Sequence, residues 1–346
     1  MKFALVGVGQ RARSHIIPAL MKCRNAEIAA LFASRQRIIS ACGSNFSVSV
    51  FEASDPQTFA NVDSVIVCVP QKSIKRVLLN LLDFGCRDKT IFIDTPVLAK
   101  RNVVSYSVVA KFSKVVVLED WLTLPTFSLA SSLIRDGKIG KLRRIYFHHS
   151  GYRHHALAMI RYWTGSVFFK KGIFFHHSAE VKELVLYDGK GVTTTIVEPR
   201  EYLNGRFLIV GEHGSVGNYP IPSSNHYFIR VVRERGRLLV SIVEGFFVKN
   251  KPLDIVGGNE LSNIELQIDG ELSGMADMDI MKIYGLMRIF DDQESTNGPT
   301  AIYRPLDAIY DRLVVDIMVR SGRVYDFAIP GGSLLKRLIK TFGLIG

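Results

Sequence analysis

The first 120 residues alternate short apolar runs with segments in which apolar residues recur at helical spacing. The first run, KFALV at 2–6, stops at a glycine, and the following SHIIPALMK has the periodicity of a helix. Runs that are apolar throughout are typical of parallel strands covered by helices on both faces. The pattern therefore predicts a doubly wound, Rossmann-like α/β domain. The expected strands are 2–6, 27–33, 47–53, 63–70, 90–94 and 114–120.

The segments between these strands predict helices. One follows the first strand, another spans about 35–42, and a short one follows residue 55. The amphipathic segment SIKRVLLNLLDFG predicts a helix that ends at Gly85. A last helix of this half starts near residue 98 and ends near residue 112.

After residue 120 the chain shows strands separated by Gly, Pro and Asn turns, and then two helical patterns at 275–292 and 305–322. No Pro-, Gly- or Ser-rich linker separates the two halves. We expect a dinucleotide-binding domain at 1–120 and an α+β domain for substrate and oligomer contacts at 121–346. The basic, amphipathic tail 333–346 could lie on a membrane, but a terminal helix packed on its own domain is favoured.

The sequence GVGQRA at 7–12 matches the G-x-G-x-x-A form of the dinucleotide-binding fingerprint, between the first strand and the first helix. Gly7 permits the tight turn, Gly9 lets the backbone approach a pyrophosphate, and Ala12 allows close packing of the helix. The start of the helix stabilises the bound anion. The predicted cofactor residues of this turn are Gly7, Gly9, Gln10, Arg11 and Ala12.

The end of the second strand indicates which dinucleotide binds. An acidic residue there would bond the ribose hydroxyls of NAD, but the chain has Ser34 and Arg35. A hydroxyl followed by a guanidinium suits the 2′-phosphate of NADP, so we favour NADP over NAD. The alternative is that Arg35 is an exposed arginine at the start of a helix.

Two further strands end in residues expected to line the same crevice. Val69 and Pro70 close the strand at 63–70. Asp94 closes the strand at 90–94, and Pro96 lies two residues after it. In open α/β sheets ligands bind at the carboxyl ends of the strands. We therefore expect these four residues to bind the cofactor.

Several motifs together resemble the glucose–fructose oxidoreductase / inositol dehydrogenase / MocA family of NAD(P)-dependent sugar oxidoreductases. The resemblance covers residues 1 to about 165 well. It implies a second domain with an open, mostly antiparallel sheet and helices on one face, and a homo-oligomer, dimer or tetramer, formed through the outer sheet face. The motifs are VGVGQRARSHIIPAL with His15 and Pro18, VDSVIVCVP, DTPVLAK in place of the family's Glu-Lys-Pro, LIRDGKIGKLRRI, and HALAMIRYWTG.

The resemblance also implies hydride transfer between a nicotinamide and a carbinol or carbonyl carbon, with a lysine and a histidine beside the substrate oxygen. His155 falls on the family's histidine, but Gly151 stands at its usual aspartate and Thr95 at its lysine. Ser73 stands near the place of another family histidine. A threonine hydroxyl can donate a hydrogen bond but supplies no positive charge.

His155 is the best replacement for the missing lysine, because an imidazole serves as acid and base near neutral pH. Tyr152 is expected within reach of the same cleft, and Thr95 is expected to line it near the nicotinamide. The alternative is that His155 caps or packs a helix. Neighbouring helical side chains diverge by about 100°, so only one of His154 and His155 should face the cofactor.

Composition adds limits rather than a new function. The net charge is +12, but the Lys and Arg are scattered and no nucleic-acid motif is present, so a solvated basic surface is favoured. The four cysteines form no CxxC pair, and no signal or membrane-spanning pattern is found, which favours a cytoplasmic protein. The histidine pairs at 148–149 and 176–177 lack partners for a tetrahedral set, so we expect no metal site.

Three functions remain open at this point. The leading hypothesis is an NADP-dependent oxidoreductase acting on a sugar or sugar-like hydroxyl or carbonyl compound, with His155 as acid and base. The second is a cofactor-binding regulator or interaction protein whose catalytic set has decayed, because the lysine and the aspartate are both missing. The third is imine reduction, in which a protonated imine needs less help from a cation.

Overall fold

The computed structural model of the chain describes residues 1–97, 106–166, 169–199, 201, 205–219, 221, 225–244, 247–248, 255–256, 259–291, 304–305, 307–311 and 325–326. These residues form two compact units. The first unit holds Met1–Thr123 and the described residues from 282 to 311, and the second holds Leu124–Met281 and residues 325–326. The expected start of a helix near 98 and the tail 333–346 lie outside the described residues.

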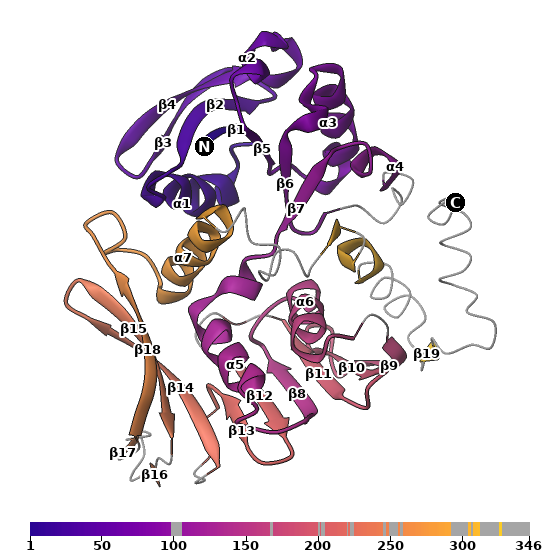
Figure 1. Cartoon of the computed structure of the whole chain (residues 1–346), viewed down its shortest axis with the longest axis vertical. Coiled ribbons are helices and arrows are strands. Elements are labelled where there is room, and N and C mark those ends of the chain that lie inside the picture. Colours follow the sequence, from indigo (N-terminus) through magenta and orange to yellow (C-terminus); the bar gives the residue numbers. More distant parts are fainter. Residues whose placement is uncertain are drawn as a thin grey trace. The chain divides into compact units, whose positions relative to one another are not determined.

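The first unit is built on a sheet with the strand order β3-β4-β2-β1-β5-β6-β7 (Figure 1). From β4 to β7 all neighbouring strands are parallel, and their order is that of a Rossmann domain. The predicted fold class is confirmed for this half of the chain. The strands are β1 Lys2–Val6, β2 Glu27–Ala33, β3 Arg37–Ala41, β4 Ser44–Val50, β5 Ser64–Val67, β6 Thr90–Asp94 and β7 Lys114–Leu118.

The predicted helix over 35–42 is wrong, because this segment is the edge strand β3, antiparallel to β4. Its side chains alternate: Ile39 and Ala41 are buried, while Ile38 is 73% exposed. Cys42 and Gly43 both have positive φ, at 48° and 68°, which is the backbone of a tight two-residue hairpin turn. The β-branched pair of isoleucines and this turn outweigh the weak helical spacing.

The helices of the first unit cover a sheet rich in phenylalanine. Phe59 stacks between Phe32 of β2 and Phe84, with ring centroids 5.1 and 5.3 Å away. The first helix begins with a wide π turn over Ala12–Ile16 before it becomes regular. The α-helices are α1 Ile17–Lys22, α2 Gln57–Ala60, α3 Gln71–Asp83 and α4 Tyr106–Val109, and single turns lie at Phe51–Ala53, Cys86–Asp88 and Asp120–Thr123.

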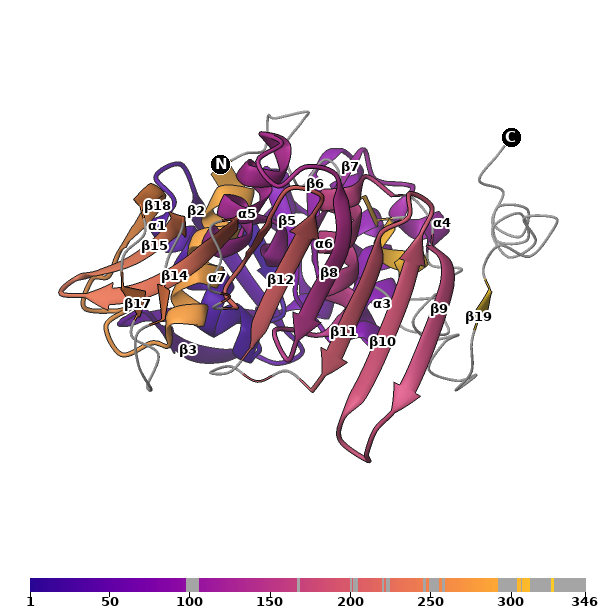
Figure 2. The same cartoon turned by 90° about the horizontal axis from the view of Figure 1, so that it is seen from below.

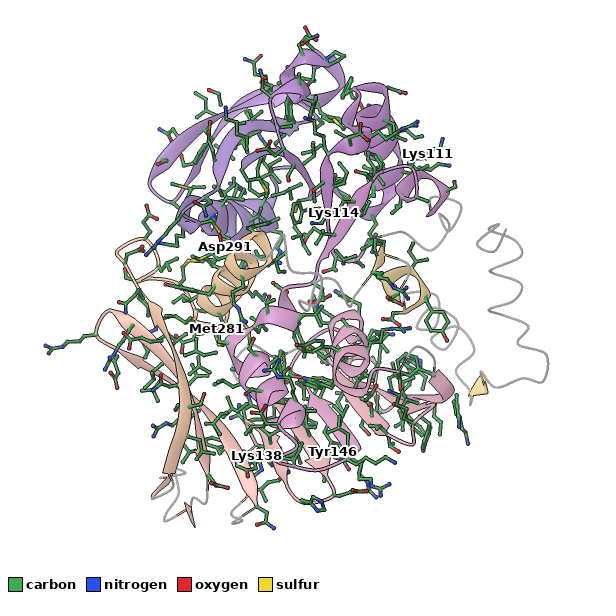
Figure 3. All side chains as sticks on the ribbon, in the orientation of Figure 1. Lys111, Lys114, Lys138, Tyr146, Met281 and Asp291 are labelled. Atoms are coloured by element: carbon green, nitrogen blue, oxygen red, sulfur yellow. The ribbon has the colours of Figure 1, made fainter. Side chains whose placement is uncertain are left out.

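The helix α7, Asp277–Asp291, contains the division between the units, after Met281. Figure 3 labels Met281 and Asp291 on this helix. In the first unit Phe290 packs edge-on against Phe3 of β1 and Phe92 of β6, with ring centroids 5.5 and 5.6 Å away. The predicted boundary near Asp120 lies beside the first division at Thr123, but the return of the chain to the Rossmann unit was not predicted.

The second unit is built on a sheet with the order β18-β15-β14-β13-β12-β8-β11-β10-β9-β19. Most neighbours are antiparallel, and the pairs β8 with β11 and β13 with β14 are parallel. The predicted open, mostly antiparallel sheet is confirmed. Its strands are β8 Leu142–His148, β9 Phe169–His176, β10 Lys182–Asp188, β11 Thr193–Glu198, β12 Arg206–Gly211, β13 Ser215–Gly217, β14 His226–Glu234, β15 Arg237–Glu244, β18 Asn259–Gln267 and β19 Tyr325–Asp326, and a separate pair is formed by β16 Phe247–Val248 and β17 Ile255–Val256.

The helices α5, Pro125–Arg135, and α6, Arg153–Thr164, contact strands of this sheet. Phe147 of β8 lies against Phe127 of α5 and stacks on Trp163 of α6, with centroids 6.2 and 5.9 Å away. Its strand neighbour Tyr146 points to the opposite face and is only half-buried. Figure 2 shows β12, β8, β11, β10 and β9 side by side.

Of the predicted helix at 305–322, residues 305 and 307–311 are described, and they are helical. The four cysteines are all free thiols, and Cys23 and Cys86 are buried. Within the described ranges no helix has the length and apolar character needed to cross a membrane.

Candidate functional site

The turn after β1 has the backbone that the fingerprint requires. Gly7 has a φ of +100°, and its N–H donates to the carbonyl of Phe32 at 2.8 Å. A Cβ at this position would lie 2.1 Å from the carbonyl oxygen of Cys68, just after β5. Only glycine therefore lets the ends of β1 and β5 approach this closely. At Gly9 a Cβ would meet no atom within 4 Å, so the turn has open space above its second glycine.

A cavity of about 310 Å³ opens beside this turn, between β1 and β5, where the strand order of the sheet reverses. A Rossmann domain binds its dinucleotide at this switch point. Of the predicted residues, Gly7, Gly9, Ser34, Val69 and Pro70 line the cavity. The described residues that line it are Val6, Gly7, Val8, Gly9, Ala33, Ser34, Arg37, Phe51, Glu52, Cys68, Val69, Pro70, Ser73, Arg76 and Val77.

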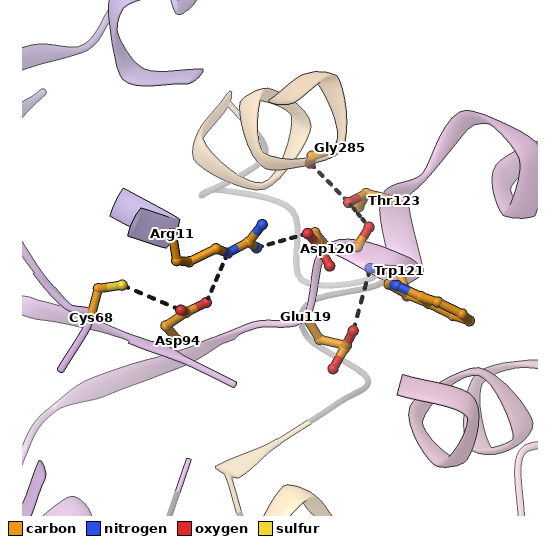
Figure 4. Close-up of polar contacts among 8 residues, drawn as sticks. All are labelled: Arg11, Cys68, Asp94, Glu119, Asp120, Trp121, Thr123 and Gly285. Carbon is orange, nitrogen blue, oxygen red and sulfur yellow. Dashed lines mark hydrogen bonds and ion pairs between the residues drawn. The ribbon is translucent and has the colours of Figure 1, made fainter. Parts of the chain in front are cut away.

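Three predicted residues of the turn lie elsewhere. Ala12 is fully buried, as expected for a residue that lets the helix pack closely. Gln10 is exposed, and its amide lies 3.5 Å from the hydroxyl of Ser14. Arg11 is not among the lining residues, and its side chain belongs to a polar network (Figure 4).

Arg11 joins the helix start to the ends of β6 and β7. Its Nη2 donates to Asp120 at 2.7 Å, and its Nε lies 3.6 Å from Asp94 (Figure 4). Burial alone would lower the pKa of Arg11, but the two carboxylates outweigh it and raise the pKa. Both carboxylates are shielded, since their side chains are only 14% and 2% exposed. The guanidinium is thus held by acidic groups, and the backbone of the turn is left to contact an anion.

Asp94 has a pKa above the ordinary value of an aspartate. Burial raises its pKa, and the opposing effect of Arg11 does not restore it. The thiol of Cys68 donates to the other oxygen of Asp94 at 3.3 Å. Burial and the neighbouring carboxylate raise the pKa of Cys68, so this thiol is a hydrogen-bond donor rather than a nucleophile.

Thr95 and Pro96 follow Asp94, and the peptide bond between Thr95 and Pro96 is cis. Both are half-buried, and the carbonyl of Pro96 accepts a hydrogen bond from Gln71 at 3.3 Å. Asp94, Thr95 and Pro96 do not line the 310 Å³ cavity.

Arg35, predicted to hold a 2′-phosphate, is exposed and does not line the cavity. Arg37, Glu52 and Arg76 line it instead, and sequence reasoning missed all three. The predicted helix over 35–42 includes Arg37, which in the structure begins β3, and the helical prediction does not direct its side chain to the cavity. The Cys42-Gly43 pair, flanked by alternating side chains, was the signal of a hairpin.

In the second unit the start of α6 gathers three rings. Tyr152 caps the helix, and its carbonyl accepts a hydrogen bond from the N–H of His155 at 3.0 Å. The ring centroids of His154 and His155 lie 4.0 Å apart, and that of Tyr152 lies 6.0 and 6.5 Å from them. The expected divergence of the two histidines is therefore not seen in their rings. The structure brings Tyr152 and His155 together, whereas Thr95 belongs to the first unit.

The base of this helix is fixed by a charged pair. Arg153 forms a salt bridge with Glu198, and its backbone N–H donates to the same carboxylate at 2.9 Å. Glu198 is buried at the end of β11. The first turn of α6 is therefore tied to the sheet, which gives the neighbouring His155 a fixed backbone.

Residues 1–115 match the model of an oxidoreductase family with an NAD-binding Rossmann fold, GFO/IDH/MocA. The predicted family resemblance is confirmed. The match covers the Rossmann part of the chain and names NAD, which agrees with the expected cofactor, NADP or NAD. No curated protein sequence matches the chain.

Solved structures of three oxidoreductases have the same fold over nearly all of the chain. Scyllo-inositol dehydrogenase from Lactobacillus casei, with bound NAD(H) and scyllo-inositol, is 13% identical with a TM-score of 0.59, covering 95% of this chain and 99% of its own. Myo-inositol 2-dehydrogenase from Lactobacillus plantarum is 14% identical with a TM-score of 0.60, covering 94% and 99%. Aldose-aldose oxidoreductase from Caulobacter crescentus, complexed with glycerol, is 15% identical with a TM-score of 0.62, covering 94% and 99%.

Proposed function

We propose that the chain is an NAD(P)-dependent oxidoreductase that transfers a hydride to or from a sugar-like hydroxyl or carbonyl compound, or an imine. One observation carries this proposal. The positive-φ turn at Gly7, the open space at Gly9 and the cavity at the switch point of the sheet fit a dinucleotide, and the same residues match the oxidoreductase family. The backbone of the turn would hold the pyrophosphate.

Of the two dinucleotides we favour NADP. The cavity is lined by two arginines and by the hydroxyl of Ser34 at the end of β2, where NAD-binding domains place a carboxylate. Guanidinium groups form short, charge-assisted hydrogen bonds to phosphate oxygens. Among the described lining residues Glu52 is the one acidic residue, and it is paired with Arg76 at 3.2 Å.

The substrate class is proposed from the relatives, whose names describe inositol and aldose oxidoreductases. When bound, the nicotinamide supplies or accepts the hydride. An imidazole nitrogen of His155 takes the hydroxyl proton in oxidation and returns it in reduction, with the phenol of Tyr152 beside it. The hydroxyl of Thr95 offers a hydrogen bond at the position of the family's lysine.

We also propose that residues 1–120 bind the cofactor, and that the sheet within 121–346 serves substrate and subunit contacts in a cytoplasmic homo-oligomer, a dimer or a tetramer. The sheet face opposite α5 and α6 exposes Phe175 and Tyr187, and an apolar hollow of about 540 Å³ lies beside Tyr146. Light scattering tests this proposal. A monomer in the wild type contradicts it, and Phe175→Asp is expected to weaken the oligomer.

A second candidate function is a cofactor-binding regulator without turnover. The observation that favours it is the composition of the strand ends. Thr95 replaces the family's lysine, and the carboxylates of Asp94 and Asp120 are both bound to Arg11. Such a protein would bind the dinucleotide but leave it unchanged with every sugar, nucleotide sugar and imine offered.

The first experiment is a fluorescence titration of cofactor-stripped protein with NADPH and with NADH. We expect saturable binding of both, tighter for NADPH. Equal affinities, or tighter NADH binding, would contradict the cofactor preference but not the oxidoreductase. Binding of neither would contradict both functions, and binding without any turnover in a substrate screen would favour the regulator.

A further inference from the structure

The hairpin of β3 and β4 places Arg37 against the cofactor turn. Arg37 is the first residue of β3, paired with Val48 of β4. Its Nη2 donates to the carbonyl of Val8, between the two glycines of the fingerprint, at 3.4 Å. This contact turns the guanidinium inward and makes Arg37 part of the cavity lining. Arg35 is only two residues away and, like Arg37, is exposed, but it does not line the cavity.

A second arginine enters the same cavity from another element. Arg76 of α3 is paired with Glu52, which follows β4, with an Nη2 to Oε1 distance of 3.2 Å. Both side chains are more than half exposed, at 67% and 56%. An ion pair this exposed contributes little to stability, so its partners are free to exchange for a stronger ligand. The lining thus offers two positive groups and one negative group around Ser34.

We propose that Arg37, not Arg35, is the residue that selects NADP in this chain. The guanidinium of Arg37 and the hydroxyl of Ser34 hold the 2′-phosphate, and Arg76 joins them when it leaves Glu52. Glu52 weakens this selection, because its carboxylate repels the phosphate and competes for Arg76. The inference rests on the proposed dinucleotide function and adds which residues decide between NADP and NAD.

The arrangement also contains the alternative. Glu52 could accept hydrogen bonds from the ribose hydroxyls of NAD, as an acidic residue after the second strand does in other Rossmann domains. The two assignments predict effects of the same substitution on different dinucleotides. Removing the Glu52 charge should tighten NADPH binding if Arg37 selects a phosphate, and should weaken NADH binding if Glu52 binds the ribose.

The test is a set of titrations with NADPH, NADH, 2′,5′-ADP and 5′-AMP, on the wild type and on Arg37→Ala, Arg35→Ala and Glu52→Gln. The two mononucleotides probe the adenosine end alone and need no turnover. We expect Arg37→Ala to weaken NADPH and 2′,5′-ADP roughly 10- to 100-fold, the loss of a charge-assisted hydrogen bond, and to leave NADH and 5′-AMP within about twofold. Arg35→Ala is the matched control and should leave all four unchanged. Glu52→Gln should tighten NADPH.

Because Arg37 also holds the turn, its truncation could disturb the fold. Arg37→Gln removes the charge but keeps most of the side-chain stem and an amide donor, and it should bind NADPH more weakly while its melting temperature stays near that of the wild type. Loss of both dinucleotides to the same extent in Arg37→Gln would overturn the inference, as would a selective loss in Arg35→Ala. Glu52→Gln that weakens NADH while Arg37→Gln changes nothing would also overturn it. If the wild type binds neither dinucleotide, the proposed function fails first and this inference with it.

Discussion

The cofactor turn and the start of α6 depend on their sequences in different ways. At the turn the proposed binding groups belong to the backbone, so the sequence must leave Gly7 and Gly9 without side chains. At the start of α6 the proposed chemistry is done by side chains, the imidazole of His155 and the phenol of Tyr152. The family pattern is complete at the turn, but it is broken at Thr95 and Gly151. A site formed by backbone atoms can be recognised even where the surrounding side chains differ from those of the family, whereas a site formed by side chains changes its chemistry with each substitution.

The largest effect is expected from adding one methyl group to the turn. In Gly7→Ala the new Cβ would overlap the carbonyl oxygen of Cys68 at 2.1 Å, with φ in the region that favours glycine. We expect a loss of more than about 3 kcal/mol in the free energy of unfolding, together with loss of dinucleotide binding. Urea unfolding and a NADPH titration measure the two effects.

Gly9→Ala is the matched control for that variant. A Cβ at Gly9 meets no protein atom within 4 Å, so the melting temperature should stay near that of the wild type. The added methyl group fills the space expected for the pyrophosphate, so NADPH binding should still weaken strongly. If Gly9→Ala binds NADPH like the wild type, the open space beside Gly9 is not the pyrophosphate site.

The next effect concerns the side chain that ties the turn to the sheet. Arg11→Ala removes the cation between Asp94 and Asp120 and leaves both carboxylates shielded from water. Breaking a buried ion pair typically costs about 3–5 kcal/mol, and we expect the lower end because Arg11 itself is 25% exposed. Arg13→Ala is the control, since Arg13 is exposed on the same helix. Equal urea midpoints for the two variants would show that the network contributes no stability.

His155→Ala tests the side-chain site. If His155 moves the proton, turnover with the best substrate should fall roughly 10²- to 10⁴-fold while the affinity for NADPH stays unchanged. His176→Ala, which removes an exposed imidazole from β9, should leave turnover unaltered. Unchanged turnover in His155→Ala would leave His155 with the alternative role of packing the start of α6.

The fold could be predicted where one pattern of side chains continues along a whole strand, and less well where a strand is short. Continuous apolar runs fix the parallel strands β1, β5 and β6, because both of their faces are buried. The hairpin was missed because Arg37–Ala41 is short, and its two isoleucines face opposite sides. Nor could the sequence predict that Phe290 packs on Phe3 and Phe92, since such a contact depends on the path of the chain and not on local spacing.

The candidate site divides in the same way. Glycine positions followed from the fingerprint, because the backbone of a tight turn accepts few residues. The partners of Arg11 did not, since Asp94 and Asp120 meet it only through the order of β1, β6 and β7 in the sheet. The sequence predicted Arg11 as one of the cofactor residues of the turn, and the structure gives its side chain two carboxylate partners.

The smallest effect is a change in how stability depends on pH. Burial raises the pKa of Asp94 in the folded protein above its usual value of 3.8. At a pH between 3.8 and this raised pKa, the folded protein holds a proton that the unfolded chain has lost. The stability that Asp94 contributes is therefore complete below about pH 4 and is lost as the pH rises through the folded-state pKa, with a slope of at most about 1.4 kcal/mol per pH unit. Asp94→Asn keeps one of the two acceptor oxygens of Asp94 and cannot titrate. Urea unfolding of both proteins from pH 4 upward should give a wild-type curve that falls relative to that of the variant, because all other groups are common to the two. Parallel curves would contradict the raised pKa and would mean that the folded and unfolded states bind the same number of protons at Asp94 over this pH range.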